Sequence, residues 1–196
     1  GMIDNQLASI KDTIIGGEHS HATLFQLRKG SNQRVLVSCG VADMRKLTHP
    51  SLICFDGQLK LNWNNKSSEP LAEGNSRGWV CQPSEEFIIQ LYPIKGGQAD
   101  DYRLVRYSAE GELLDSYRED IRGFDQLIYE GMKEGLGDYC FSFGMFQSGE
   151  DDRHHGVITK RNSVGEVIWK KYYQHPDYSS PRNLNIITDI LEYPNG

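Results

Sequence analysis

Long apolar runs are missing from this chain of 196 residues. No run approaches the roughly 18 residues that a membrane-spanning helix needs, so we expect no membrane partner. Helical periodicity is scarce as well: only residues 2–14 and 124–136 repeat apolar positions at helix spacing, and 124–136 also fits a strand. The hydrophobic fraction of 38% suits many short strands that keep one face in water. The chain therefore predicts an all-β fold in a single domain over residues 1–196.

Paired cysteines are also absent, because no CxxC motif occurs and the four cysteines lie far apart. Each falls inside a predicted strand among apolar neighbours; they are Cys39, Cys54, Cys81 and Cys140. We expect buried free thiols that pack as small hydrophobic side chains, with no disulfide and no catalytic cysteine. Met2 after Gly1 indicates a native start without a signal peptide, and together with the thiols this predicts a cytoplasmic protein.

Clusters of basic residues are the third absence. The formal net charge is −6, and Lys and Arg are interspersed with acids. The densest basic run, residues 153–161, directly follows the acidic stretch 149–152. Because a nucleic acid is held by clustered cations that release counterions, this distribution argues against a nucleic-acid partner.

What the chain does contain is a repeat of strand, turn and strand. Gly57, Gly111 and Gly165 stand 54 residues apart, each in a short polar turn between two β-rich runs. Glycine accepts the positive φ of a tight turn without a Cβ clash, so all three are predicted turn residues. Two further apolar runs precede each turn, which predicts four antiparallel strands per repeat of about 54 residues. The predicted strands are 23–28, 34–39, 51–55 and 58–63, then 78–82, 87–93, 101–107 and 112–118, then 125–131, 139–146, 155–161 and 166–173.

The repeat predicts three complete units, over about residues 23–63, 78–118 and 125–173, and a partial unit at the termini. Residues 185–196 resemble the first strand of a further unit, and residues 3–10 resemble a last strand without its partners. If these segments share a sheet within one chain, they close a ring of about four units, near the lower limit of β-propellers. If they pair between two chains, the protein is a homodimer joined through its terminal strands.

The segment RNSVGEVIWKKYY (161–173) resembles the bacterial β-propeller repeats of the quinoprotein and kelch-like type. The segment YSAEGELLDSYRED (107–120) resembles them less closely, and the first unit less again. The resemblance implies a propeller-like fold and no particular activity. The glycine pair and tryptophan ladder that position a quinone cofactor in true quinoproteins are not evident. A β-trefoil of three four-stranded repeats is the alternative fold, followed by an antiparallel β-sandwich.

The histidines gather at one predicted end of the molecule. In an antiparallel meander each strand reverses direction, so the loops between second and third strands lie at the same end as the connections between units. That end carries all six histidines and many acids, and it is the predicted binding face. The candidate ligand-binding residues are His49, Asp100, Asp101, Asp151, Asp152, His154, His155 and His175. The candidate metal ligands are His19, His21, His154 and His155, because closely spaced imidazoles suit a divalent metal.

Two functions fit these observations. The favoured one is a non-enzymatic binding module, a rigid β scaffold that presents its acidic, histidine-containing loop face to a protein or a small ligand. The alternative is a hydrolase that uses a divalent metal or a carboxylate pair on the same face. No catalytic residue is assigned, because the chain has no GxSxG elbow and no phosphate-binding loop with its Lys-Ser/Thr pair. Beyond a divalent metal, no cofactor is expected.

Overall fold

The computed structural model describes residues 22–43, 45, 47–71, 78–94, 101–119, 124–148, 154–174 and 185–194. These residues form three four-stranded sheets. The first sheet contains β1 (Ala22–Lys29), β2 (Val35–Ala42), β3 (Thr48–Phe55) and β4 (Leu61–Lys66), with a 3-10 turn, η1 (Ser31–Gln33), after β1. The second contains β5 (Trp79–Cys81), β6 (Phe87–Ile94), β7 (Asp101–Ser108) and β8 (Leu113–Arg118). The third contains β9 (Phe124–Glu134), β10 (Tyr139–Ser148), β11 (His154–Asn162) and β12 (Val167–Tyr173).

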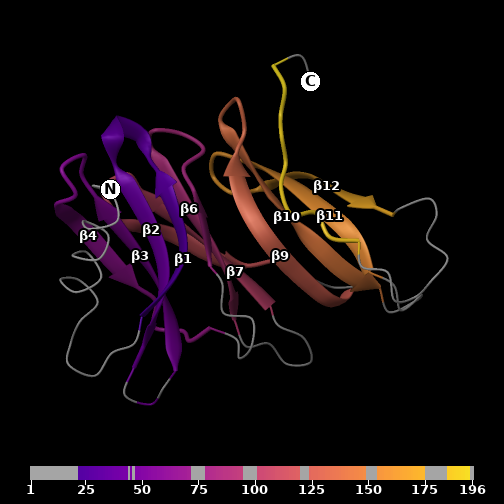
Figure 1. Ribbon diagram of the computed structural model, residues 1–196, viewed down its shortest axis with the longest axis horizontal. Helices are drawn as coiled ribbons and strands as arrows, with labels where there is room; N and C mark the ends of the chain where they lie inside the picture. The colour runs from indigo at the N-terminus through magenta and orange to yellow at the C-terminus, as the bar shows by residue number, and fades with distance from the viewer. Residues whose placement is uncertain are drawn as a thin grey trace, which may run out of the picture.

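Each sheet is an antiparallel meander, and the three sheets stand side by side as a fan (Figure 1). The first strand of the second sheet, β5, contacts both β1 and β9, which are the first strands of the other two sheets. On β1, the guanidinium of Arg28 donates to the carbonyl oxygen of Met132 on β9 at 2.5 Å. The three first strands therefore converge, as in a propeller. The sheets do not join into a barrel.

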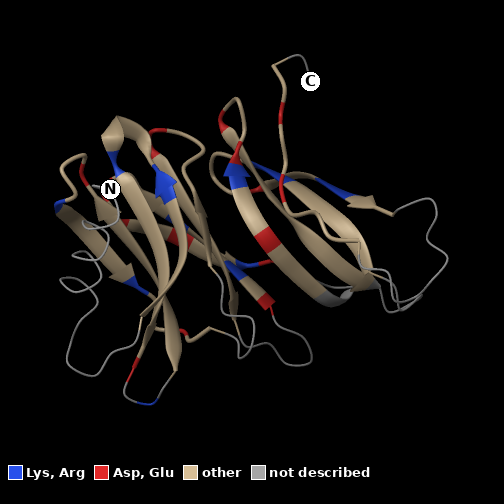
Figure 2. Ribbon diagram, in the orientation of Figure 1, with Lys and Arg blue, Asp and Glu red and all other residues tan. Residues whose placement is uncertain are grey.

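The predicted all-β repeat is confirmed, since a strand occupies each of the twelve predicted positions. Residues 124–134 are strand β9, which decides against a helix over 124–136. The other helix candidate, 2–14, lies outside the described residues. Nowhere in the described ranges is there a helix long and apolar enough to cross a bilayer. Lys and Arg are interspersed with Asp and Glu over the sheets (Figure 2).

The turn register differs from the prediction in the first sheet. In the turns between third and fourth strands, positive φ occurs at Gly111 (88°) and Gly165 (91°), but in the first sheet it falls on Leu59 (61°) and not on Gly57. The reason is the start of the turn at Asp56, whose carboxylate accepts hydrogen bonds from the backbone N–H groups of Gln58 and Lys60 at 2.9 and 2.8 Å. Ser108 and Asn162 accept the same two bonds in the other sheets, so in all three turns the positive φ falls three residues after the accepting side chain. Strand β4 consequently begins at Leu61, three residues later than predicted. The equivalent turn residues of the first and second sheets, Leu59 and Gly111, are therefore 52 residues apart. Those of the second and third sheets, Gly111 and Gly165, are 54 apart.

Apolar side chains fill both interfaces between neighbouring sheets, because alternate residues of a strand point to opposite faces. The interface between the first and second sheets, here called the first interface, buries Leu36, Leu52, Cys54, Val80, Ile88, Tyr92, Val105 and Tyr107 among others. The interface between the second and third sheets, the second interface, buries Cys81, Ile89, Leu91, Tyr102, Leu104, Leu127, Tyr129, Met132, Cys140, Phe146 and Val157. All four cysteines are free and buried, as predicted. Burial raises the pKa of the Cys39 thiol to about 11.

One polar contact recurs at both interfaces. At the first, the side-chain amide of Asn65 donates to the carbonyl oxygen of Gly111 at 2.6 Å. At the second, the hydroxyl of Tyr117 donates to the carbonyl oxygen of Gly165 at 2.5 Å. Asn65 and Tyr117 are equivalent residues of β4 and β8, since they pair with Leu52 and Leu104. The last strand of each sheet thus binds the turn of the next sheet, so the two interfaces share one geometry.

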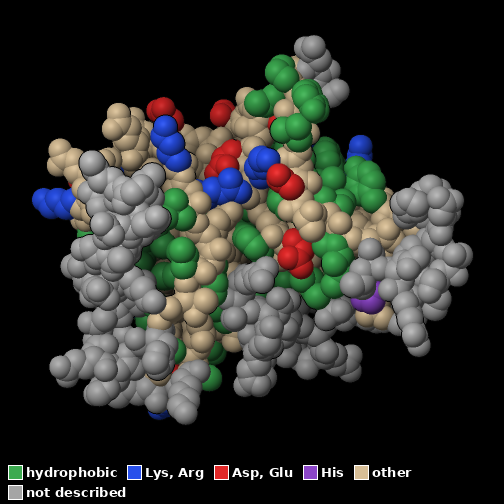
Figure 3. Space-filling view, in the orientation of Figure 1, with side chains coloured by type: hydrophobic (Ala, Val, Ile, Leu, Met, Phe, Trp, Pro, Cys, Tyr) green, Lys and Arg blue, Asp and Glu red, His purple; other side chains and the backbone are tan. Residues whose placement is uncertain are grey.

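The predicted strand over residues 185–191 is not a strand. Residues 185–194 cross the third sheet in an extended path, with one backbone hydrogen bond, from Ile187 N–H to the Gly144 carbonyl at 3.2 Å. Side-chain contacts hold the rest of this C-terminal segment, because Lys133 binds Asp189 at 3.0 Å and Tyr139 donates to Glu192. Hydrophobic side chains gather along it (Figure 3). The matching N-terminal segment, 3–10, lies outside the described residues, so strand pairing between the termini stays a prediction.

Candidate functional site

Three of the predicted ligand-binding residues occupy one repeat position. His49, Asp101 and His155 lie near the start of the third strand in each sheet and pair with Val41, Ile94 and Phe146, respectively. Because each belongs to a different sheet, the repeat distributes them around the molecule and does not gather them at one point. His154 precedes His155 and accepts, through its backbone carbonyl, a hydrogen bond from Asn185 at 3.0 Å.

The side chains of His49, Asp101 and His155 each have a local partner, whereas the buried Nδ1 atom of His154 has no hydrogen-bond partner among the described residues. The Nε2 atom of His49 lies 3.2 Å from the Asp43 carboxylate, which also accepts two backbone hydrogen bonds of its own loop. Asp101 forms an ion pair with Arg118 at 3.4 Å. The ring of His155 stacks on Phe146, with centroids 5.0 Å apart. Within the described ranges, no three His, Cys, Asp or Glu side chains are placed to hold a metal ion.

The other predicted site residues lie outside the described part of the chain. They are His19, His21, Asp100, Asp151, Asp152 and His175. Their roles as ligand-binding or metal-ligating residues stay predictions.

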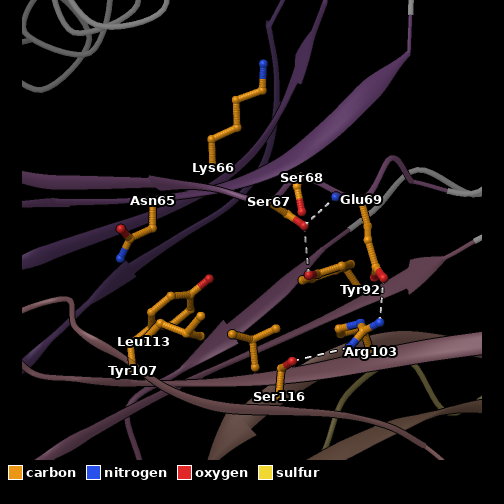
Figure 4. Close-up of a pocket in the computed structure, with 11 residues that line it drawn as sticks. Asn65, Lys66, Ser67, Ser68, Glu69, Tyr92, Arg103, Tyr107, Leu113 and Ser116 are labelled. Atoms are coloured by element: carbon orange, nitrogen blue, oxygen red, sulfur yellow. Dashed lines mark hydrogen bonds and ion pairs between the residues drawn. The ribbon is translucent and has the colours of Figure 1, made fainter.

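A cavity of about 340 Å³ opens in the first interface, between the end of β4 with the segment that follows it and the faces of β7 and β8 (Figure 4). Its lining combines hydroxyl, amide and charged groups with apolar side chains. The lining residues are Asn65, Lys66, Ser67, Ser68, Glu69, Tyr92, Arg103, Val105, Tyr107, Leu113 and Ser116. Lys66 belongs to this lining, but its ammonium group points away from the other lining residues (Figure 4).

One ion pair lies in this lining. The guanidinium of Arg103 binds Glu69 at 2.6 Å and Ser116 at 3.2 Å, so it links the segment after β4 to the outer strand of the next sheet. Glu69 is itself placed by a local turn, in which its backbone N–H donates to the Ser67 hydroxyl at 3.1 Å. The positive charge of Arg103 and the negative charge of Glu69 cancel, so this pair adds no net charge to the lining.

The back of the cavity is a buried polar chain. Tyr92 donates to the Ser67 hydroxyl at 3.2 Å, and Tyr107 donates to the side-chain carbonyl of Gln90 at 3.4 Å. Burial raises the pKa of both phenols, with a smaller contribution at Tyr107 from its neighbour Tyr92. Both phenols stay protonated at neutral pH. They can therefore donate a hydrogen bond or accept one, and they do not act as bases.

The equivalent place in the second interface is filled. Two residues after Asn65 and Tyr117 come Ser67 and Glu119, which donate through their backbone N–H groups to the equivalent carbonyls of Pro50 and Tyr102. In the facing sheet, strand register makes Tyr107 equivalent to Arg161, and Ser116 equivalent to Lys170.

In the second interface, Glu119, Arg161 and Lys170 form an ion network at the place where the first interface has its cavity. Glu119 accepts from Arg161 at 2.6 Å, from Lys170 at 2.9 Å and from the Tyr129 hydroxyl at 2.7 Å. The side chain of Arg161 is 0% exposed and that of Glu119 is 4% exposed. Burial alone would raise the pKa of Glu119, but the charges of Arg161 and Lys170 and the hydrogen bond from Tyr129 lower it below its usual value.

The cavity residues were not predicted from the sequence, although one signal was present. Arg103, Val105 and Tyr107 alternate along a strand and therefore share one face. That face is buried at Val105 and Tyr107, so an arginine in line with them indicates an unusual polar environment. Thr159 and Arg161 give the same signal on β11. The short Ser-Ser-Glu segment after β4 carries no comparable pattern.

No protein-family model matches this chain, and a search of curated proteins found no match.

Proposed function

We propose that the protein is a non-enzymatic binding module that holds a small polar ligand in the cavity of the first interface. The observation that carries the proposal is the contrast between two equivalent places. At the second interface, Glu119, Arg161 and Lys170 fill the space, whereas at the first the shorter or neutral Ser67, Tyr107 and Ser116 leave about 340 Å³ open. This volume lies near the lower end of the range for small-molecule sites, which favours a compact ligand.

The lining suits binding more than chemistry. Apolar side chains of Val105 and Leu113 are combined with hydroxyl, amide and charged groups, so the cavity can position a polar ligand. The carboxylate of Glu69 is already paired with Arg103 at 2.6 Å. One side of the cavity, at Glu69 and Arg103, lies at the end of the sheets that carries the predicted binding face, because β4 ends there and β7 begins there beside Asp101. We therefore propose that the binding face includes this end of the molecule.

The likeness to quinoprotein and kelch-like propeller repeats supports the proposal at the level of scaffold only. Such folds present loops and clefts for many purposes, and function depends on the individual site. A cytoplasmic location belongs to the same proposal, and four free buried thiols fit a reducing compartment.

The metal- or carboxylate-dependent hydrolase stays the alternative hypothesis. It depends mainly on residues of the loop face that lie outside the described ranges, such as His19 and Asp151. Titration with zinc, manganese and calcium tests it, because a specific site would bind one of them stoichiometrically and raise the melting temperature.

A panel of small metabolites of all charge classes, read out by thermal shift and ligand-observed NMR, tests the proposed function. Ser116→Trp places an indole at the exposed mouth of the cavity, and Asp115→Trp is the matched control because the adjacent residue pairs with Arg106 and points to the opposite face. We expect at least one compound to bind the wild type and the control and to lose binding to Ser116→Trp. Binding that is equal in all three proteins, or found in none, would refute the proposal.

A further inference from the structure

We infer that the ligand of this cavity is a neutral, hydroxyl-rich small molecule of about the size of a monosaccharide. The inference rests on the proposed function and specifies the chemistry that the site selects. It is argued from the charge balance of the lining, from its hydrogen-bonding groups and from the contrast with the second interface.

Charge balance excludes an ionic ligand from a stable place in the cavity. The ion pair of Arg103 and Glu69 is the charged part of the lining whose side chains turn inward, and its two charges already neutralise each other at 2.6 Å. The Glu69 Oε2 and Arg103 Nε atoms are buried without a hydrogen-bond partner in the part of the chain that the structure describes. An anion or a cation in the cavity would lose water without meeting a free counter-charge, which is costly. At the second interface the opposite holds, since the Glu119 carboxylate meets two cations there.

Hydroxyl groups dominate the remaining polar lining. Five side chains carry them, and each can both donate and accept a hydrogen bond; they are Ser67, Ser68, Tyr92, Tyr107 and Ser116. Ligand hydroxyls have the same dual capacity, so a polyol can bond to this lining both as donor and as acceptor. The hydroxyls of Tyr92 and Ser67 lie together at one side of the space, and that of Tyr107 points into it (Figure 4).

The apolar part of the lining fits the same class. Val105 and Leu113 offer aliphatic contact, and the ring of Tyr107 is braced by Trp63, with centroids 6.3 Å apart and planes inclined by 28°. A ring-shaped polyol has C–H-bearing faces that can lie on such a surface while its rim hydroxyls reach the polar groups. The cavity is large enough for one such ring.

Three isosteric probes test the inference: D-glucose, its anionic analogue D-glucuronate and its cationic analogue D-glucosamine in slightly acidic buffer. Titrations are followed by amide chemical shifts of the wild-type protein. We expect glucose to perturb the amides of Arg103 and Ser116, and each charged analogue to bind at least about tenfold more weakly.

A charge variant sharpens the test. Glu69→Gln leaves Arg103 without its counter-charge, so we expect the preference to move toward glucuronate, by about tenfold or more relative to glucose. Asp115→Asn is the matched control, because Asp115 forms a similar pair with Arg106 at 2.5 Å but lies outside the cavity lining. The control should keep the wild-type preference.

The outcomes separate the two proposals. If a charged analogue binds the wild-type cavity as well as glucose does, or if Glu69→Gln leaves the preference unchanged, the ligand class is wrong while the binding site stands. If the metabolite panel yields cavity ligands but none of the three probes binds, the polyol inference is likewise refuted. If no compound of the panel or the probe set binds in a way that Ser116→Trp abolishes, the proposed function itself fails.

Discussion

The interfaces on the two sides of the second sheet have the same strand geometry but different contents. In each, the last strand of one sheet binds the turn of the next, through Asn65 and Gly111 or through Tyr117 and Gly165. Beyond this shared contact, the second interface encloses a charged network and the first encloses a cavity. The comparison shows that repeated sheets can share one backbone geometry while their side chains fill one interface and leave the other available for a separate role.

Breaking the charged network should have the largest effect on stability. Glu119→Leu leaves the fully buried guanidinium of Arg161 without its carboxylate, so we expect the free energy of unfolding to fall by about 3–5 kcal/mol. Urea denaturation measures the loss. The double variant Glu119→Leu/Arg161→Met should recover part of it, because the unpaired charge is removed. Equal stability of Glu119→Leu and wild type would mean that the network does not contribute to the second interface.

Acid should produce a weaker form of the same loss. The pKa of Glu119 is lowered in the folded state from its usual value of 4.5, so the folded state favours the carboxylate. Its contribution to stability is complete above that value and disappears as pH falls through the lowered pKa. We expect the urea midpoint to fall on acidification below about pH 4.5, and to fall less in Glu119→Gln. Parallel pH profiles of the two proteins would contradict this assignment.

Removal of the C-terminal segment extends the comparison to the outer face of the third sheet. Deleting residues 185–196 removes Ile187 from its contact with Gly156 and frees Lys133 and Tyr139. We expect a loss of about 1–3 kcal/mol from the missing burial and hydrogen bonds, with increased binding of a hydrophobic dye. A truncated protein that is as stable as the full chain and binds no more dye would show that the segment does not cover this face.

The turn glycines should differ among the three sheets. Gly111→Ala and Gly165→Ala each combine a positive φ with a close contact, at 2.5 Å from Trp63 and 2.8 Å from Leu104, so a loss of about 1–2 kcal/mol is expected. Gly57→Ala is the control, because Gly57 has ordinary φ and its nearest neighbour is the flexible Gln33. Thermal melts should rank Gly57→Ala closest to wild type. If Gly57→Ala were the least stable of the three variants, Gly57 would be the residue equivalent to Gly111, as the 54-residue repeat predicts.

The smallest effect is expected at the first interface. Ser67→Ala removes the acceptor of Tyr92 beside a cavity that water can enter, so we expect a loss below about 1 kcal/mol. It contrasts with the equivalent position, Glu119. Urea denaturation of both variants in one buffer makes the comparison. A loss at Ser67 as large as that at Glu119 would show that the first interface depends on its polar contacts for stability.

The sequence predicted the strands better than the site, for physical reasons. Alternation of apolar residues depends on local backbone geometry, so strands such as β6 and β7 were located within one residue. The turn between β3 and β4 was predicted in the wrong register because it begins at Asp56 and places Leu59, a residue with a Cβ, at the positive φ that glycine adopts in the other two sheets.

The cavity depends on three residues from two sheets, Ser67, Tyr107 and Ser116, whose proximity arises only from packing. The histidines were predicted to lie at one end, and those within the described residues begin the third strands there. Their separation follows from the fan of sheets, which a one-dimensional repeat does not reveal.

Chemical-shift mapping with glucose on the isotope-labelled protein tests the central claim most directly, because both interfaces report in one spectrum. The cavity account predicts concentration-dependent shifts at Arg103 and Ser116 and unchanged signals at the equivalent network residues, Glu119 and Lys170. Shifts centred on Glu119 and Lys170, or on the strand starts at His49 and His155, with the cavity signals unchanged, would contradict it.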